Sequence, residues 1–257
     1  MSIAALILDV DGTLADTEEA HRVAFNLAFE RLGLGWTWSR VDYLRLLTVT
    51  GGKERLLSHV RALPVSARER ARLSAFVPSI HHEKTKFYQS AVNDGAVPLR
   101  DGVARLIAEA RSAGCRLAIA SASTASSVRA LLRQGFGPKG HELFEVIVCA
   151  EHVAAKKPEP DVYEVVLRHL KLRHDQAVAL EDSPNGLLAA DAAGLWTVVT
   201  PTLWTVAGHF DLAGLCLPRL GDPWYPLSRE PGHLLLDRPW LRFAELVRRA
   251  ESATSCR

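Results

Sequence analysis

The chain has 257 residues, of which 48% are hydrophobic and 23% charged, values typical of a globular protein with one large domain or a core carrying a smaller insertion. Its net charge of +2 gives no electrostatic reason to expect binding to nucleic acid or to an anionic membrane. The four cysteines are scattered and no apolar run approaches the roughly 20 residues of a membrane span, so we expect a cytoplasmic protein without a disulfide framework or a cysteine zinc site.

The first predicted strand covers residues 4–8, and the segment that follows it reads as a helical insertion. Residues 17–95 contain helical patterns at 56–63 and 68–76 and no convincing strand. Asp16 and Glu19 have the spacing of a capping box, which predicts that a helix begins there. We therefore expect an all-helical cap domain over residues 17–95, with Trp36 and Trp38 packed inside it, and a core formed by residues 1–16 and 96–257.

The rest of the core is predicted to alternate between strands and helices. Short apolar runs predict further buried strands at 117–120, 146–149, 177–180 and 197–200, and helical patterns occur at 101–111, 123–134, 162–170 and 187–193. Such alternation indicates an α/β fold with a Rossmann-like parallel sheet and right-handed crossovers. The tail after about residue 205 is rich in Pro and Gly, with a last short strand expected near 214–217 and a helix near 240–250.

Polar groups of particular kinds follow four of the predicted strands. Asp9 and Asp11 come directly after the first, and a Glu181-Asp182 pair follows the strand at 177–180. Ser121 follows the strand at 117–120 and precedes Ala122, Ser123 and a helix N-terminus, which is a ready anion site. Because ligands of parallel sheets bind at the carboxyl ends of the strands, these groups are expected to share one site.

That site would hold more negative charge than its one predicted ammonium, Lys157, can offset. Lys157 is preferred over its neighbour Lys156 because it precedes Pro158, which biases it toward an extended conformation. Two carboxylates about 4 Å apart repel by on the order of 4 kcal/mol at an effective dielectric constant near 20. Mg²⁺ is bound by few carboxylates together with water and substrate phosphate oxygens, so the pattern predicts a Mg²⁺ site that also receives a phosphate.

The same residues resemble the four motifs of the haloacid dehalogenase-like hydrolase superfamily: DVDGT, a serine that ends a strand, a lysine before proline, and an ED pair. The match covers roughly residues 4–200, and the insertion after the first motif resembles the helical cap of phosphoglycolate phosphatases and β-phosphoglucomutases. Within the superfamily the chain is most similar to the CbbY-type branch, on the stretches DTEEAH, TGGKERLL, KKPEPDVY, EDSPNGL and VVTPT with a later LGDP. Leu8, where the family often has phenylalanine, is a departure that should not affect the chemistry.

This resemblance implies a HAD-type phosphoric monoester hydrolase that uses Mg²⁺ and acts on a small-molecule sugar phosphate, most specifically xylulose-1,5-bisphosphate; we expect it to act as a monomer. Asp9 would be the nucleophile that becomes aspartyl-phosphate. Asp11 would act as general acid and base, and its backbone carbonyl would bind the metal. Ser121 and Lys157 would hold the transferring phosphoryl group. Asp182 would be a metal ligand, with Glu181 beside it.

Residues of the cap are expected to recognise the rest of the substrate. Glu18 and His21 lie three apart and so share one helical face, although His21 also has a simpler interpretation as a surface residue. By resemblance to the mutase, Gly52 and Lys53 lie where a distal phosphate would bind. Arg55 and Lys84 are second choices for this role and are more simply read as exposed charges. His81 and His82 have no partner at metal-ligand spacing and are expected at the surface.

Three other functions remain open from the sequence. A phosphosugar mutase of the β-phosphoglucomutase type shares the aspartate pair and the cap, and a phosphoglycolate-like phosphatase shares the cap topology. A phosphosugar-binding or receiver-like module also gathers aspartates, a hydroxyl and a lysine around Mg²⁺. A receiver carries its phosphoacceptor on a middle strand of a shorter chain, whereas Asp9 follows the first strand here, so this module ranks low.

Overall fold

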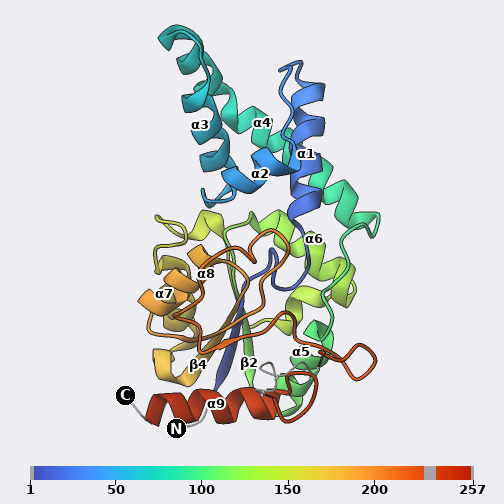
Figure 1. The fold of residues 1–257 in the computed structure, drawn as a ribbon, viewed down its shortest axis with the longest axis vertical. Helices are drawn as coiled ribbons and strands as arrows, with labels where there is room; N and C mark the ends of the chain where they lie inside the picture. The colour runs from blue at the N-terminus through green and yellow to red at the C-terminus, as the bar shows by residue number, and fades with distance from the viewer. Residues whose placement is uncertain (1–2, 229–235, 256–257) are drawn as a thin grey trace.

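A six-stranded parallel sheet forms the centre of the computed structural model, which describes residues 3–228 and 236–255 (Figure 1). The strand order is β3-β2-β1-β4-β5-β6, and every neighbouring pair is parallel. The strands are β1 (Ala5–Leu8), β2 (Arg116–Ala120), β3 (Val146–Val148), β4 (Ala177–Glu181), β5 (Trp196–Val199) and β6 (Leu215–Cys216). The α/β prediction is confirmed, including the short last strand in the tail.

Helices cover both faces of this sheet, which explains why its strands are continuous apolar runs. Leu6 and Leu8 of β1 pack in one cluster with α5 (Val103–Ser112), α6 (Ala125–Phe136) and α9 (Phe243–Ser255). Ala5 and Ile7 point to the other face, toward α7 (Asp161–Leu170) and α8 (Pro184–Ala192). Short 3₁₀ turns occur at Gly140–Leu143, Ala150–His152 and His174–Gln176.

Four helices lie together at the carboxyl-end side of the sheet, at the top of Figure 1. They are α1 (Glu18–Arg31), α2 (Arg40–Leu46), α3 (Gly52–Ala62) and α4 (Ala67–Asn93), and we call them the cap. Their cluster of buried residues includes Phe25, Phe29 and Tyr43. Trp38 is buried in this cluster and Trp36 packs against it, as predicted. The cap therefore has its own hydrophobic core.

The start of the cap differs from the sequence prediction. Helix α1 begins after Thr17, whose side chain makes no capping hydrogen bond, so the predicted capping box of Asp16 and Glu19 is wrong. The Glu19 carboxylate instead accepts hydrogen bonds from Arg22. Arginine offers charged donors in a fixed fork, and this competes successfully with one backbone N–H.

The chain leaves and returns to the sheet at adjacent points. Ala15, before α1, forms an antiparallel bridge with Leu99, after α4, and the Arg100 N–H donates to the Leu14 carbonyl at 2.8 Å. Cys115, Cys149 and Cys216 are free thiols, while Cys256 lies outside the described residues. Within residues 3–228 and 236–255, every helix is too short or too polar to cross a membrane.

Candidate active site

Asp9 and Ser121 are held at the ends of neighbouring strands by backbone hydrogen bonds. The Asp9 N–H donates to the Leu180 carbonyl at 3.0 Å, and the Ser121 N–H donates to the Val148 carbonyl at 3.0 Å. The Ser121 hydroxyl is buried and accepts the Ser123 N–H at 3.1 Å. The parallel ladder thus fixes the backbone of both predicted residues at one edge of the sheet.

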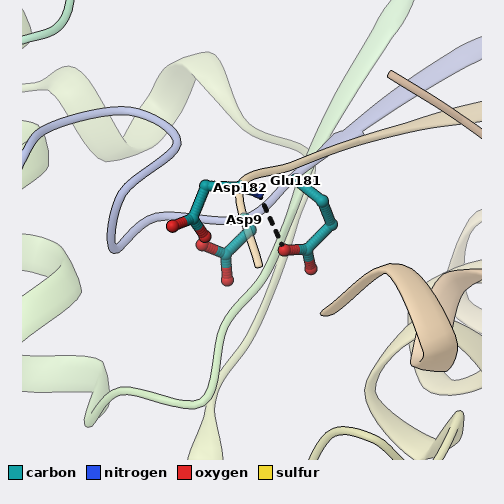
Figure 2. A group of neighbouring side chains, drawn as sticks. All are labelled: Asp9, Glu181 and Asp182. Carbon is teal, nitrogen blue, oxygen red and sulfur yellow. Dashed lines mark hydrogen bonds between the residues drawn. The ribbon is translucent and has the colours of Figure 1, made fainter. Parts of the chain in front are cut away.

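Asp9, Glu181 and Asp182 form a buried acidic group at this edge (Figure 2). One ligand atom of each lies within 4.8 Å of the others. In Figure 2 the carboxylates of Asp9 and Asp182 lie side by side, while Glu181 turns to the other side and accepts the Asp182 N–H at 3.3 Å. Three carboxylates this close repel one another, so cations or hydrogen-bond donors around them are needed to offset the repulsion.

Lys157 supplies the positive charge on one side of this group. Its Nζ lies 2.6 Å from Asp9 Oδ1, 2.5 Å from Glu181 Oε1 and 2.9 Å from the Ala120 carbonyl. Burial alone would lower the pKa of Lys157, but the charges of Asp9 and Glu181 raise it above its usual value, so the lysine is charged. Lys156, the neighbour not chosen from the sequence, also lines the cavity but pairs with Glu54 of α3 at 2.6 Å.

The Asp9–Asp182 side of the group fits a divalent cation. Burial raises the pKa of both carboxyls well above the usual range. The charge of Glu181 adds to this effect on both, and the charge of Asp9 adds to it on Asp182. A Cβ added to Gly12 would lie 2.2 Å from Asp182 Oδ2, so only glycine lets this carboxylate lie against the loop after β1. Oxygen ligands from two aspartates suit a hard cation, which would keep both ionised. Glu181, the third member of the acidic group, is engaged at Oε1 by Lys157 and by the Tyr163 hydroxyl, each at 2.5 Å, and its predicted place beside the metal stays a prediction.

The Asp11 carboxylate lies in a separate environment. It accepts hydrogen bonds from the Thr17 hydroxyl at 2.7 Å and the Ser123 hydroxyl at 2.5 Å, and contacts His21 Nε2 at 2.9 Å. Burial alone would raise the pKa of Asp11, but the contact with His21 and these hydrogen bonds lower it, so Asp11 is ionised. Its predicted metal contact was the backbone carbonyl, and this stays a prediction.

His21, on α1 of the cap, is buried against Asp11, so its interpretation as a surface residue is wrong. Its Nδ1 lies 2.7 Å from Lys84 Nζ, and its ring stacks on Tyr88 with centroids 4.0 Å apart. Burial and the Lys84 charge lower the pKa of His21. A neutral imidazole that accepts from Lys84 at Nδ1 can donate at Nε2 to Asp11, which links the cap to the loop after β1.

A cavity of about 730 Å³ lies between the strand ends and the cap. Asp9, Asp11, Lys157 and Asp182 line one side, together with Ala122 and Ser123. The cap contributes the predicted residues Glu18, His21, Gly52, Lys53, Arg55 and Lys84. The volume is that of a typical small-molecule site. The structure thus brings most of the predicted residues to one cavity, whereas Ser121 and Glu181 are buried behind its wall.

The cationic side chains of the cap differ in whether they already have hydrogen-bond or ion-pair partners. Lys53 is exposed and makes no hydrogen bond or ion pair with any residue in the described part of the chain. Arg55 and Lys84 are only 7% and 6% exposed, so the interpretation of both as exposed charges is wrong. Arg55 donates to the Tyr43 hydroxyl at 2.8 Å, and that hydroxyl donates to Glu18 at 2.8 Å. Lys53 is therefore the cation most available to a ligand.

His81, which was expected at the surface, is half-buried and lines the cavity. A Cβ added to Gly52 would lie 2.8 Å from its Nε2, so the ring packs directly against the start of α3. Burial, reinforced by the charges of Lys84 and Lys53, lowers the pKa of His81 to about 3. Its position three residues before Lys84 on α4 was the one signal that could have found it.

Direct contacts join the cap to the sheet around this cavity. Besides the Glu54–Lys156 ion pair, Asn185 at the start of α8 donates to the Thr50 hydroxyl at 2.8 Å. Tyr43 of α2 meets Trp204 edge to face, with ring centroids 5.7 Å apart. The loop after β5 and the start of α8 thus meet the cap at the cavity rim.

Comparisons with known proteins agree with this geometry. The chain is 48% identical over 229 residues to the plasmid CbbY protein of Cupriavidus necator, covering 89% of this chain and 90% of the relative. A crystal structure of CbbY from Rhodobacter sphaeroides in complex with phosphate is 44% identical, with a TM-score of 0.78 over 84% of this chain and 94% of that one. A structure of a mutant of the same protein in complex with xylulose-(1,5)bisphosphate matches with 43% identity and a TM-score of 0.78 over the same shares.

The family model of the haloacid dehalogenase-like hydrolases matches residues 3–194. This range begins before β1, contains the whole cap and ends after α8, so it includes every residue described above at the acidic end of the cavity. The predicted CbbY-type resemblance and the predicted enzyme class, a HAD-type phosphoric monoester hydrolase, are confirmed. On these matches, the chain belongs to the haloacid dehalogenase-like hydrolase family.

Proposed function

We propose that this protein is a Mg²⁺-dependent phosphatase of a sugar bisphosphate, most directly xylulose-1,5-bisphosphate, and that Asp9 becomes aspartyl-phosphate during turnover. The observation that carries this proposal is that one cavity joins the acidic group beside Lys157 to a cation-bearing wall of the cap. The related CbbY structure in complex with xylulose-(1,5)bisphosphate supports the choice of substrate.

In the first step a carboxylate oxygen of Asp9 attacks phosphorus and the bond from phosphorus to the ester oxygen breaks. Lys157 Nζ, 2.6 Å from Asp9 Oδ1, orients the nucleophile and offsets negative charge on the transferring group. Ser121, Ala122 and Ser123 precede α6, whose N-terminal end favours an anion. Phosphoryl transfer depends mainly on such positioning and charge neutralisation.

Asp11 would transfer the proton in both steps of the reaction. In its protonated form it gives a proton to the leaving alkoxide, and as carboxylate it then takes a proton from water, whose oxygen attacks phosphorus and releases Asp9. The structure holds Asp11 as the carboxylate through Thr17, Ser123 and His21, which corresponds to the form that acts as base. Asp11 ends the cycle protonated and returns to the carboxylate by releasing this proton to solvent, and it takes up one proton again when the next substrate binds, so atoms and protons balance.

Asp9 and Asp182 are the residues that would hold Mg²⁺, together with the Asp11 carbonyl predicted from the family resemblance. When bound, the cation supplies charge stabilisation for the phosphoryl oxygens. Glu181 supports the site by orienting Lys157 and accepting the Asp182 N–H. A divalent cation fits here because two carboxyls are buried side by side without enough positive charge around them to offset their own.

The cap would bind the second phosphate. Lys53 is the first choice, because it lines the cavity and has no ion-pair partner among the described residues. His81 lies against the same turn of α3 and adds a ring nitrogen that can donate a hydrogen bond.

The test is a panel of sugar mono- and bisphosphates incubated with Mg²⁺, including xylulose-1,5-bisphosphate and ribulose-1,5-bisphosphate. We expect release of inorganic phosphate, fastest from xylulose-1,5-bisphosphate. Formation of an isomeric sugar phosphate without net release of phosphate would instead establish the mutase alternative. Faster hydrolysis of phosphoglycolate than of any bisphosphate would favour the phosphoglycolate-like alternative.

A further inference from the structure

Arg100 lies in the connection from α4 to α5, outside every motif that carries the family resemblance. Its backbone N–H donates to the Leu14 carbonyl at 2.8 Å, next to the bridge between Ala15 and Leu99. The two connections between the cap and the sheet are therefore paired at this residue. A shift of the cap that moves either connection acts on Arg100.

The guanidinium of Arg100 binds the backbone of two loops at the acidic end of the cavity. Its Nη1 donates to the carbonyl of Gly12, after β1, and to the carbonyl of Thr200, after β5, at 2.7 Å. Its Nη2 donates to the Pro201 carbonyl at 3.1 Å. A planar fork with five N–H donors can satisfy three carbonyls at once, which a lysine ammonium on a flexible stem does less well.

These two loops flank the Asp182 carboxylate. A Cβ on Gly12 would lie 2.2 Å from Asp182 Oδ2, so the first loop lies directly against it. Thr205, in the second loop, donates its hydroxyl hydrogen to the same oxygen at 3.3 Å. Thr205 is itself held by Thr202, whose backbone N–H donates to the Thr205 hydroxyl at 2.9 Å. Arg100 thus fixes both sides of Asp182 without being within the acidic group.

We propose that Arg100 is a positioning residue that ties the paired cap connections to the loops flanking Asp182, and so holds this carboxylate at the distance from Asp9 that a divalent cation requires. The proposal rests on the proposed Mg²⁺-dependent function.

The test compares Arg100→Lys with Arg70→Lys in the full chain. Arg70 is a matched control, because it also donates to two backbone carbonyls, those of Leu63 and Val65, at 2.9 and 3.3 Å, but within the cap and outside the cavity lining. The first measurement is Mg²⁺ binding by isothermal titration calorimetry. The second compares the Mg²⁺ concentration for half-maximal activity with the KM for the sugar bisphosphate at saturating Mg²⁺.

We expect Arg100→Lys to weaken Mg²⁺ binding and to raise the Mg²⁺ requirement at least fivefold, while KM at saturating Mg²⁺ changes less than twofold. Arg70→Lys should leave all three values within twofold of the wild type. Equal Mg²⁺ binding in wild type and Arg100→Lys would overturn the proposal, and so would equal changes in Mg²⁺ requirement and KM, because these indicate general distortion.

Loss of folding is separated from loss of positioning by a second variant, Thr205→Val, which removes the hydroxyl contact to Asp182 from the other side. We expect it to weaken Mg²⁺ binding in the same direction as Arg100→Lys, and unchanged binding would count against the proposal. If the wild type binds Mg²⁺ but hydrolyses no sugar phosphate, the proposed function fails while the calorimetric comparison still decides the role of Arg100.

Discussion

The two ends of the cavity are built in different ways. At the sheet end, Asp9, Lys157 and Glu181 are held by one another and by strand backbone, with distances of 2.5 and 2.6 Å at the ammonium. At the cap end, Lys53 lies free of ion pairs among the described residues and His81 is kept neutral by its surroundings. Groups that are already held in place stabilise the charge that develops in the transition state, whereas a cation without a partner is free to bind a charged ligand. The sheet end therefore suits the reaction and the cap end suits selection of the substrate.

The largest expected effect is at the sheet end. We predict that Asp9→Asn lowers kcat for phosphate release at least 10³-fold, about 4 kcal/mol in activation free energy, because the amide is a poor nucleophile and leaves Lys157 with Glu181 alone. Phosphate release under single- and multiple-turnover conditions measures this loss. Asp211→Asn, an exposed aspartate, is the control. Turnover of Asp9→Asn within tenfold of the wild type would remove Asp9 as the nucleophile.

At the cap end we expect a smaller effect that depends on the substrate. Lys53→Ala should raise KM for sugar bisphosphates about tenfold, or about 1.4 kcal/mol, because an unpaired ammonium that meets the second phosphate is lost. KM for monophosphates should stay within twofold. Lys139→Ala, which removes an exposed lysine outside the cavity, should change neither. Equal effects on both substrate types would show that Lys53 does not bind the distal phosphate.

The smallest effect concerns the stability of the cap end. The folded protein keeps His81 neutral down to a pKa of about 3, whereas the unfolded chain protonates it below its ordinary value of 6.5. Protons therefore favour the unfolded chain as the pH falls through 6.5. Between pH 7.5 and 5.5 we predict that the wild type loses about 1 kcal/mol more unfolding free energy than His81→Gln.

The groups that face His81 and oppose its protonation are Lys84 on α4, Lys53 on α3, Lys156 before α7 and His21 on α1. Urea unfolding at the two pH values measures the difference, with His82→Gln as control because His82 is the exposed neighbour. If His81→Gln and His82→Gln show the same pH dependence, the ring is not held neutral by the cavity.

The sheet end was largely predictable from the sequence, because strand ends and motif residues follow each other locally. Buried runs such as residues 177–180 predict strands, and their carboxyl ends must meet at one edge of a parallel sheet. Ser183 and Pro184 mark the start of α8 in the same local way, and the Ser183 hydroxyl accepts the Gly186 N–H at 3.1 Å.

The cap was less predictable because the formation and packing of its helices depend on contacts between residues that are distant in the sequence. Helix α2 (Arg40–Leu46) has seven residues and depends on packing of Tyr43, and α4 continues to Asn93 through Pro78, which local rules disfavour. His81 and Arg100 look like ordinary surface charges in the sequence. Only the approach of α3 and of the loops after β1 and β5 gives them their roles.

The central claim is that one cavity joins phosphoryl-transfer chemistry at the sheet to recognition of a second phosphate at the cap. The most direct measurement is the ratio of kcat/KM for xylulose-1,5-bisphosphate to that for a xylulose monophosphate, with saturating Mg²⁺ and phosphate release as readout. The account predicts a ratio of at least ten that falls toward one in Lys53→Ala. A wild-type ratio near one, or turnover that persists without a divalent cation, would contradict it.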